Sequence, residues 1–161
     1  MTRLSVLDQS PVPEGSTAGD ALRNTLDLAR RTEALGYHRY WVAEHHGMTG
    51  LAGSSPEALI GSIASVTNHI RVGSGGVMLT HYAPLKVAEA FCVLASLHPG
   101  RIDLGVGRAP GSDHLTAAAL ARGGPTRAVG SLGANGASRR RWGGGAASEE
   151  ETPKTSAEAV S

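Results

Sequence analysis

The sequence lacks several features that would set it apart from ordinary globular proteins. It has one cysteine, Cys92, which excludes an internal disulfide; its place in an apolar helical pattern predicts a small buried side chain. The formal net charge of +1 gives no bulk attraction to nucleic acid. No apolar run is long enough to span a bilayer, and residues 1–11 lack the apolar stretch of a secretory signal. These absences predict a cytoplasmic protein without nucleic-acid or membrane partners.

What the chain does have is a regular alternation of strand and helix patterns, in a length of 161 residues that suits one domain. Strands are expected at residues 4–7, 40–43, 70–75 and 102–106, and apolar residues recur at helical spacing between them. A new strand follows roughly every thirty residues, the length of one βα unit. The pattern predicts parallel strands joined by right-handed helical crossovers, in a doubly wound sheet or in part of a (β/α)8 barrel.

Each of the first three predicted helices carries a start signal. Thr17–Asp20 forms a capping box, and Ser55–Pro56 and Pro84 place a proline in the first helical turn. The apolar stripe of the first helix extends to Leu35 and that of the third helix to Leu97. Both leucines are therefore predicted to be buried.

The pattern stops at about residue 121, which divides the chain into residues 1–121 and a tail of residues 122–161. A fourth helix is expected after Asp113. The tail is rich in Gly, Ala, Arg and Glu and has too few large apolar side chains to offset the entropy of ordering, so we expect disorder. It allows three interpretations: an Arg-rich anion-binding tail, a solvated tail, or the product of a reading frame that shifted near residue 122. We favour the last because periodicity is lost abruptly.

Polar residues and glycines follow the ends of all four predicted strands. The four groups are Asp8-Gln9-Ser10, Glu44-His45-His46, Gly75-Gly76 and Gly107-Arg108. In a parallel α/β protein the carboxyl ends of the strands lie on one rim, where such proteins bind ligands. The four groups together predict an active site at that rim.

The two histidines after the second strand are the clearest chemical signal. Neighbours on a strand point to opposite faces, so at most one of His45 and His46 is expected to face the site. We favour one histidine that donates or relays a proton to a bound substrate. The alternatives are a structural histidine and a metal site that recruits His81 and Asp8. No third and fourth ligand stands nearby at suitable spacing, so no metal is predicted.

The glycines of residues 73–76 match neither a phosphate loop nor a dinucleotide fingerprint. Without Cβ atoms they allow close approach of the backbone to a flat ligand, and a simple bulge is the alternative. Arg108, at the end of the fourth strand, suits a phosphate or a carbonyl-rich ring, and a surface arginine is the alternative. Neither feature identifies the ligand by itself.

Several motifs, in their order and spacing, resemble those of the bacterial luciferase-like flavin-dependent monooxygenases. They are WVAEHHG (41–47), IRVGSGGVML (70–79), APLKVAEAF (83–91) and LHPGRIDLGVGRAPGSD (97–113). LDQSPVPEG (7–15) resembles the alkanal monooxygenase-like subgroup. The resemblance covers about residues 3–121 and corresponds to the N-terminal half of a family member.

The resemblance implies a TIM barrel, of which this chain supplies about four N-terminal βα units. It implies an enzyme that uses reduced FMN and O2 to oxygenate a small organic substrate. A separate NAD(P)H-dependent flavin reductase would supply the reduced flavin, and the family suggests a homodimer. Two alternatives stay open: an F420-dependent oxidoreductase of the same superfamily, and a non-catalytic fragment that binds flavin or a partner.

Five residues match functional positions of the family. His45 resembles the catalytic histidine near the flavin and the substrate. Gly75 and Gly76 match the place of an unusual cis peptide that packs under the isoalloxazine ring. Arg108 matches an arginine near the flavin phosphate. Gly107 stands where luciferase has a cysteine, so no thiol chemistry is implied there.

The chain departs from the family in length, because a TIM barrel has eight βα units. The missing half would add phosphate contacts and much of the substrate pocket, and Asp8, Gln9 and Glu44 are expected only as rim residues. Half a barrel also leaves two open strand edges and an exposed apolar layer. We therefore expect the chain to bind FMN weakly and to have little activity.

Overall fold

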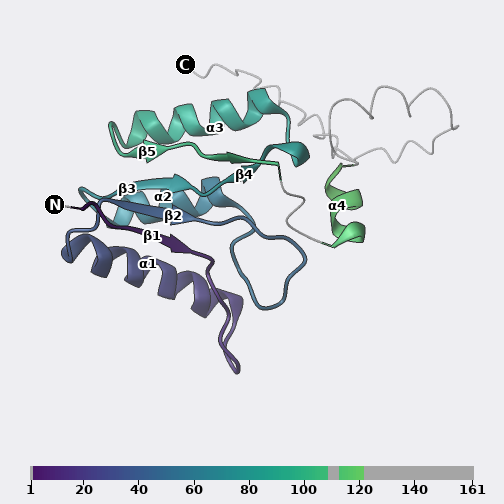
Figure 1. Ribbon diagram of the computed structural model, residues 1–161, viewed down its shortest axis with the longest axis horizontal. Coiled ribbons are helices and arrows are strands. Elements are labelled where there is room, and N and C mark those ends of the chain that lie inside the picture. The colour runs from purple at the N-terminus through teal and green to yellow at the C-terminus, as the bar shows by residue number, and fades with distance from the viewer. Residues whose placement is uncertain (1, 109–112, 122–161) are drawn as a thin grey trace, which may run out of the picture.

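The computed structural model describes residues 2–108 and 113–121, so the predictions for the tail of residues 122–161 lie outside the described residues. Strands and helices alternate as the sequence predicts (Figure 1). The elements are β1 (Ser5–Asp8), α1 (Ala18–Ala34), β2 (Arg39–Val42), α2 (Pro56–Val66), β3 (Arg71–Ser74), β4 (Val77–Met78), the 3-10 turn η1 (Leu79–His81), α3 (Pro84–Leu97), β5 (Ile102–Asp103), β6 (Val106–Gly107) and α4 (His114–Ala121).

The main sheet is parallel, with strands in the order β1, β2, β3 and β5. Leu7 lies beside Trp41, Trp41 beside Gly73, and Gly73 beside Asp103. The strands of this sheet follow one another in chain order, and a helix lies between each adjacent pair, with β4 and η1 also inserted between β3 and β5. This is the arrangement of the wall of a (β/α) barrel.

The strand expected at residues 102–106 is two short strands, so that prediction is wrong in detail. β5 pairs with β3, whereas β6 pairs with β4 in a second, two-stranded parallel sheet. The Ser74 hydroxyl donates to the Gly105 carbonyl oxygen at 2.8 Å and accepts from the Gly105 N–H at 3.0 Å. The Ser74 side chain thus binds the backbone of Gly105, the residue at which β5 and β6 are separated.

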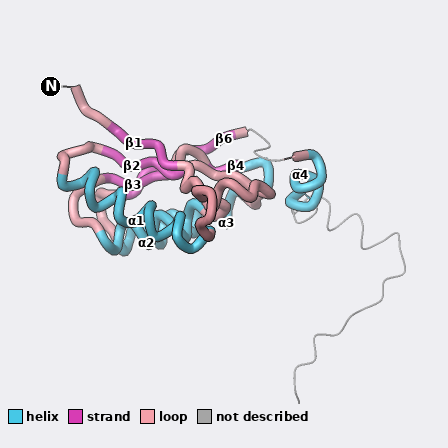
Figure 2. Tube along the Cα trace, turned by 90° about the horizontal axis from the view of Figure 1, so that it is seen from below, coloured by secondary structure: helices cyan, strands magenta, loops and turns pink. Residues whose placement is uncertain are grey.

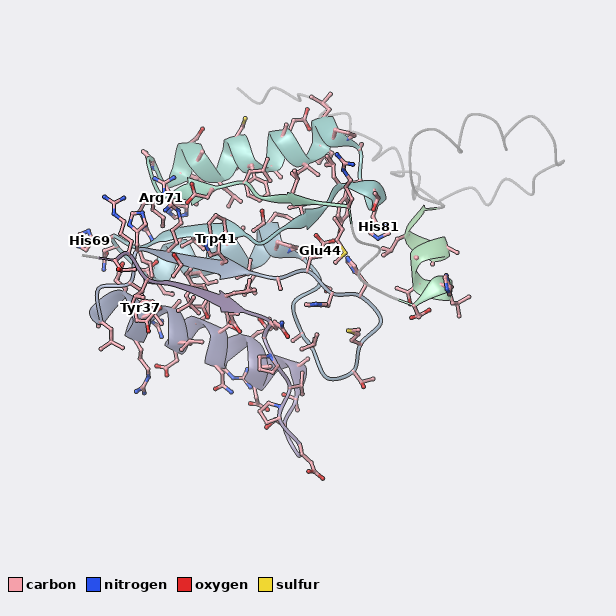
Figure 3. All side chains as sticks on the ribbon, in the orientation of Figure 1. Tyr37, Trp41, Glu44, His69, Arg71 and His81 are labelled. Carbon is pink, nitrogen blue, oxygen red and sulfur yellow. The ribbon has the colours of Figure 1, made fainter. Side chains whose placement is uncertain are left out.

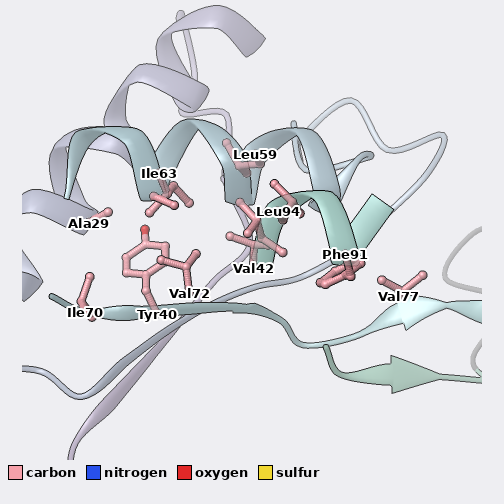
Figure 4. Close-up of a cluster of buried hydrophobic side chains, with 12 residues drawn as sticks. Ala29, Tyr40, Val42, Leu59, Ile63, Ile70, Val72, Val77, Phe91 and Leu94 are labelled. Carbon is pink, nitrogen blue, oxygen red and sulfur yellow. The ribbon is translucent and has the colours of Figure 1, made fainter. Parts of the chain in front are cut away.

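The hydrophobic core lies between the main sheet and helices α1, α2 and α3, which cover one face of it (Figure 2). The strands contribute Tyr40, Val42 and Val72, all fully buried. The helices contribute Ile60, Ile63, Phe91 and Leu94. Figure 4 shows Ile63, Phe91 and Leu94 on the side of the strands that carries Tyr40, Val42 and Val72. Each such side chain stabilises the fold by about 1.5–3 kcal/mol, so this layer fixes the sheet on which the strand ends are carried.

The opposite face of the main sheet carries no helix among the described residues (Figure 2). Leu7 on this face is 57% exposed, and Leu104 and Val106, beyond β5, are 45% and 60% exposed. β1 and β5 are the edge strands of the sheet. The predicted exposed apolar layer and open strand edges are therefore confirmed within the part of the chain that the structure describes.

Helix starts follow the predicted signals. The Thr17 hydroxyl accepts the Asp20 N–H while the Asp20 carboxylate accepts the Thr17 N–H, which confirms the capping box. α2 and α3 begin at Pro56 and Pro84.

Along the described residues, no helix is both long and apolar enough to cross a membrane.

Three predictions of buried side chains are wrong. Leu35 is 75% exposed, because it follows the last turn of α1, where the chain turns at Gly36 with a φ of +77°. Leu97 is 69% exposed at the last residue of α3. Cys92 is exposed, because the core-facing residues of α3 are Phe91 and Leu94 and the cysteine lies on the outer side. Helical spacing is correct here, but it does not show where the sheet beneath the helix ends.

Candidate functional site

The segment after β2 carries both predicted histidines. β2 ends at Val42, so the strict alternation of a strand does not extend to His45 and His46. The His45 N–H donates to the Gly53 carbonyl oxygen at 2.9 Å, which holds the returning loop against the segment. The two imidazoles, both partly buried, nevertheless have different surroundings. The Nδ1 atom of His45 is buried and has no hydrogen-bond partner within the described residues, whereas His46 is hydrogen-bonded.

Glu44 is a buried carboxylate at the centre of this end of the sheet, with 2% of its surface exposed. Its Oε2 accepts the Met78 N–H at 2.8 Å. Its Oε1 accepts the Tyr82 hydroxyl at 2.6 Å and lies 2.7 Å from His46 Nε2. The carboxylate therefore joins the segment after β2 to β4 and to the residue that follows η1.

Tyr82 was not predicted from the sequence, although its hydroxyl lies at the site. Burial raises the pKa of Tyr82, and its hydrogen bond to the Glu44 carboxylate raises the pKa further because ionisation would place two negative charges together. The residue is 38 positions from Glu44, and nothing in the local sequence links the two. It acts here as a neutral hydrogen-bond donor.

His81 of η1 lies beside this cluster. Its ring makes edge contacts with His46 and Tyr82, with ring centroids 6.1 and 6.4 Å apart. Figure 3 shows Glu44 and His81 at one end of the sheet and His69 and Arg71 at the other. Among residues 2–108 and 113–121, no group of three or more His, Cys, Asp or Glu is arranged to hold a metal ion.

Gly75 and Gly76 follow β3, and the peptide bond between them is cis, which confirms the predicted cis peptide. Gly75 is exposed, and a Cβ atom there would lie 3.2 Å from Leu7 Cδ1 and 3.3 Å from Trp41 Cβ. A Cβ atom on Gly76 would lie 3.0 Å from the backbone C and O of Gly105. The peptide thus lies at the open face of the sheet, where glycine allows the two backbone segments to approach.

Gly107 and Arg108 reach the same rim through β6. Met78 pairs with Gly107 between β4 and β6, and the Met78 N–H donates to Glu44. Arg108 is the next residue and is exposed. One carboxylate and one strand pair thus connect the segment of His45 with that of Arg108.

Asp8 and Gln9 end β1 in different environments. Asp8 is 6% exposed and accepts the Ser10 N–H at 2.8 Å, the Thr25 hydroxyl at 2.6 Å and the Tyr40 hydroxyl at 2.7 Å. These contacts lie on the side of α1 and favour a structural role for Asp8. Gln9 is exposed. Their roles at the rim stay predictions.

The loop after β2 also approaches the start of α4. A Cβ atom on Gly47 would lie 2.5 Å from Thr116 Oγ1 and 3.2 Å from Asp113 Oδ2. Gly47 has a φ of +68°, which glycine adopts readily. The loop that carries the histidines therefore lies between the sheet and α4.

These features define a parallel α/β wall whose strand ends lie at one rim. Residues 2–128 match the model of the family described as luciferase-like monooxygenase. The chain therefore belongs to the luciferase-like monooxygenase family, and its fold is the N-terminal part of the TIM barrel of that family.

Three known proteins illustrate the similarity. N-acetyl-S-alkylcysteine monooxygenase of Bacillus subtilis (strain 168) is 58% identical over 120 residues, which cover 74% of this chain and 36% of that protein. The structure of apo-MsnO8 is 50% identical with a TM-score of 0.74 and covers 76% of this chain and 37% of its own. The oxygenating constituent of 3,6-diketocamphane monooxygenase from Pseudomonas putida, in complex with FMN, shares the fold at 22% identity, with a TM-score of 0.64 and coverage of 68% of this chain and 30% of its own. The chain spans little more than a third of the length of the curated relatives it matches.

Proposed function

We propose that this chain is the N-terminal part of a flavin-dependent monooxygenase that uses reduced FMN and O2 to oxygenate a small organic substrate. The proposal rests on two features at the same end of the main sheet. The first is the imidazole of His45, with a buried Nδ1 that has no partner among the described residues. The second is the cis Gly75-Gly76 peptide on the open face of the sheet, of which Gly75 is exposed. A relative that is 58% identical is a monooxygenase, which supports the reaction class.

The residues at the rim fit a flat anionic cofactor. Gly75 and Gly76 would support the isoalloxazine ring, because no side chain stands between the ring and the peptide. Trp41 and Leu7 lie against Gly75 and would exclude water from that side. Arg108 would bind the phosphate as a charged donor. When bound, reduced FMN would supply the activation of O2 that no amino-acid side chain provides.

His45 would donate a proton to the substrate or accept one from it. An imidazole can donate or accept a proton near neutral pH, and a buried nitrogen without a partner is free to bind a substrate atom. The hydrogen bond from the His45 N–H to Gly53 fixes the backbone that carries the ring. Glu44, Gly107 and the exposed Gln9 complete the proposed rim, and Asp8 supports it from the side of α1.

The rest of the proposal concerns the longer relatives as well as this chain. A separate NAD(P)H-dependent reductase would supply reduced FMN, and the assembled enzyme would be a cytoplasmic homodimer. Because this chain spans little more than a third of its curated relatives, we expect it by itself to bind FMN weakly and to turn over slowly. Titration of the purified chain with FMN under reducing conditions tests this; micromolar affinity would refute weak binding.

The catalytic role of His45 is tested with His45→Ala under excess reduced FMN, with O2 consumption and product measured in single turnovers. Loss of a general acid or base lowers the rate by about 100-fold or more, with little change in flavin affinity. His69→Ala, an exposed histidine at the other end of the sheet, is the matched control (Figure 3). Equal rates for His45→Ala and the control would contradict the proposal.

Tests on the same purified chain distinguish two other functions from the proposed one. A deazaflavin titration distinguishes an F420-dependent oxidoreductase, which would bind F420 in preference to FMN and transfer hydride. A non-catalytic fragment would retain flavin, or bind a protein partner, without consuming O2 with any aldehyde or alkane.

A further inference from the structure

Glu44 is a buried acidic residue whose side-chain oxygens are bound in an unusual way. Along the described residues, no Lys or Arg lies within ion-pair distance of its carboxylate; its only ion-pair candidate is His46. A buried carboxylate is unfavourable unless its oxygens accept hydrogen bonds. Glu44 meets this need with one donor from its own segment, His46, and with two donors from elsewhere, Met78 of β4 and Tyr82 after η1. The carboxylate therefore holds these segments together.

Glu44 lies in the chain next to His45 and binds a residue close to the Gly75-Gly76 peptide. Glu44 directly precedes His45, and Met78 lies two residues after Gly76. The hydrogen bond from the Met78 N–H to Glu44, at 2.8 Å, therefore links the segment that carries the His45 imidazole to the segment that carries the Gly75-Gly76 peptide. On the other side, the His45 N–H is held by Gly53 at 2.9 Å. Movement of the Glu44 carboxylate would change the spacing between the imidazole and the Gly75-Gly76 peptide.

The second oxygen of Glu44 adds a restraint that backbone contact alone would not give. Tyr82 donates to Oε1 at 2.6 Å, and His46 Nε2 lies 2.7 Å from the same atom. The His81 ring packs edge-on against both His46 and Tyr82. Partners on both oxygens fix the orientation of the carboxylate as well as its position.

We propose that Glu44 is a positioning residue: its buried carboxylate sets the distance and orientation between His45 and the Gly75-Gly76 peptide by binding Met78 and Tyr82. The consequence for turnover rests on the proposed function above. The geometric statement concerns the chain alone and is tested without a cofactor.

The first test compares Glu44→Gln with Glu57→Gln by NMR of the ligand-free, isotope-labelled chain. Glu57 is the control because its carboxylate acts on Tyr82 through its charge alone and instead accepts the Ser55 hydroxyl at 2.9 Å. In Glu44→Gln we expect shifts of the His45 ring and of the Gly75 and Gly76 amides, and faster exchange of the Met78 amide. Shifts no larger than in Glu57→Gln would overturn the proposal.

A spectroscopic titration isolates the contact with Tyr82. The charged groups that act on the Tyr82 hydroxyl are the carboxylates of Glu44 and Glu57, and His46 and His81 pack beside it. Tyrosine absorbance at alkaline pH should show Tyr82 ionising at lower pH in Glu44→Gln than in the unchanged chain. An unchanged titration would show that the carboxylate does not hold the phenol, against the proposal.

Tyr82→Phe tests the same contact if Glu44→Gln does not fold. It removes one donor, leaves Met78 in place, and should shift the same three groups by a smaller amount; no shift would overturn the proposal. Under excess reduced FMN, both variants should lower kcat at least several-fold more than they raise KM. If the NMR shifts occur but the unchanged chain forms no oxygenated product, the geometric proposal holds and the proposed function fails. If turnover occurs and is equal in all variants, positioning by Glu44 fails while the proposed function stands.

Discussion

The phenol hydroxyl of Tyr40 donates a 2.7 Å hydrogen bond to the Asp8 carboxylate, and both side chains are buried between the main sheet and α1. Tyr40 is fully buried and Asp8 is 6% exposed. Burial raises the pKa of Tyr40, and the hydrogen bond to Asp8 raises the pKa further. This pair connects β1 to β2 directly below the rim, so it bears on both stability and the position of the loop after β1.

Tyr40→Phe removes that donor and leaves the buried Asp8 carboxylate with fewer hydrogen bonds. We expect the free energy of unfolding to fall by about 1–3 kcal/mol, the cost of an incompletely satisfied buried group. Urea unfolding followed by circular dichroism measures it. Tyr37→Phe, a partly buried tyrosine at the other end of the sheet, is the control (Figure 3). An equal effect of the two substitutions would contradict the assigned role of the pair.

Acid should destabilise the fold through Glu33. Burial alone would raise the pKa of Glu33, but its Oε1 accepts the N–H groups of His69, Ile70 and Asn68 at 2.6, 2.9 and 2.8 Å, and these bonds lower the pKa overall. A lowered pKa in the folded state adds stability that is present above the unfolded pKa of about 4.3 and is lost as the pH falls through the folded pKa.

The measurement is the midpoint of urea unfolding at pH 7 and at successive lower pH values. Glu33→Gln should show less loss of stability on acidification than the unchanged chain. Glu89→Gln, which removes an exposed carboxylate 3.4 Å from Lys86, should follow the unchanged chain. Parallel curves for all three proteins would show that the backbone contacts of Glu33 do not determine the acid response.

Gly73 is required by close packing within the main sheet. A Cβ atom there would lie 2.6 Å from both the Asp103 carbonyl oxygen and Trp41 Cζ3. We expect Gly73→Ala to lower the free energy of unfolding by about 1–3 kcal/mol, because the backbone has to shift to make room. Gly50→Ala is the control, since no atom of the described structure lies within 4 Å of a Cβ atom there. Thermal melts of both variants decide the point; a neutral Gly73→Ala would contradict it.

The open face of the main sheet should drive self-association. Leu7 and Val106 are 57% and 60% exposed on or beside this face, next to open strand edges. Leu7→Ser with Val106→Ser should reduce association in sedimentation velocity and raise solubility. Leu115→Ser, at a leucine that is 83% exposed on α4, should have a smaller effect. Association that follows Leu115 and ignores the sheet face would reject this expectation.

The sequence by itself predicts the helix starts and the alternation of strands and helices. The capping box at Thr17, the prolines that open α2 and α3, and the alternation of strand and helix depend on residues close together in the chain. The cis peptide at Gly75-Gly76 was predicted through resemblance to a family and is present. The roles of His45 and Arg108 stay predictions.

Tertiary structure decided what the local pattern could not. The expected fourth strand is divided at Gly105, which binds the Ser74 hydroxyl 31 residues away, and Leu35 and Leu97 are exposed because both lie at the ends of their helices. Glu44 reads in the sequence as a polar residue at a strand end, and only the fold places Tyr82 and Met78 against it. Propensities and caps act between near neighbours, whereas the partner of a buried charge is set by whichever distant segment packs beside it.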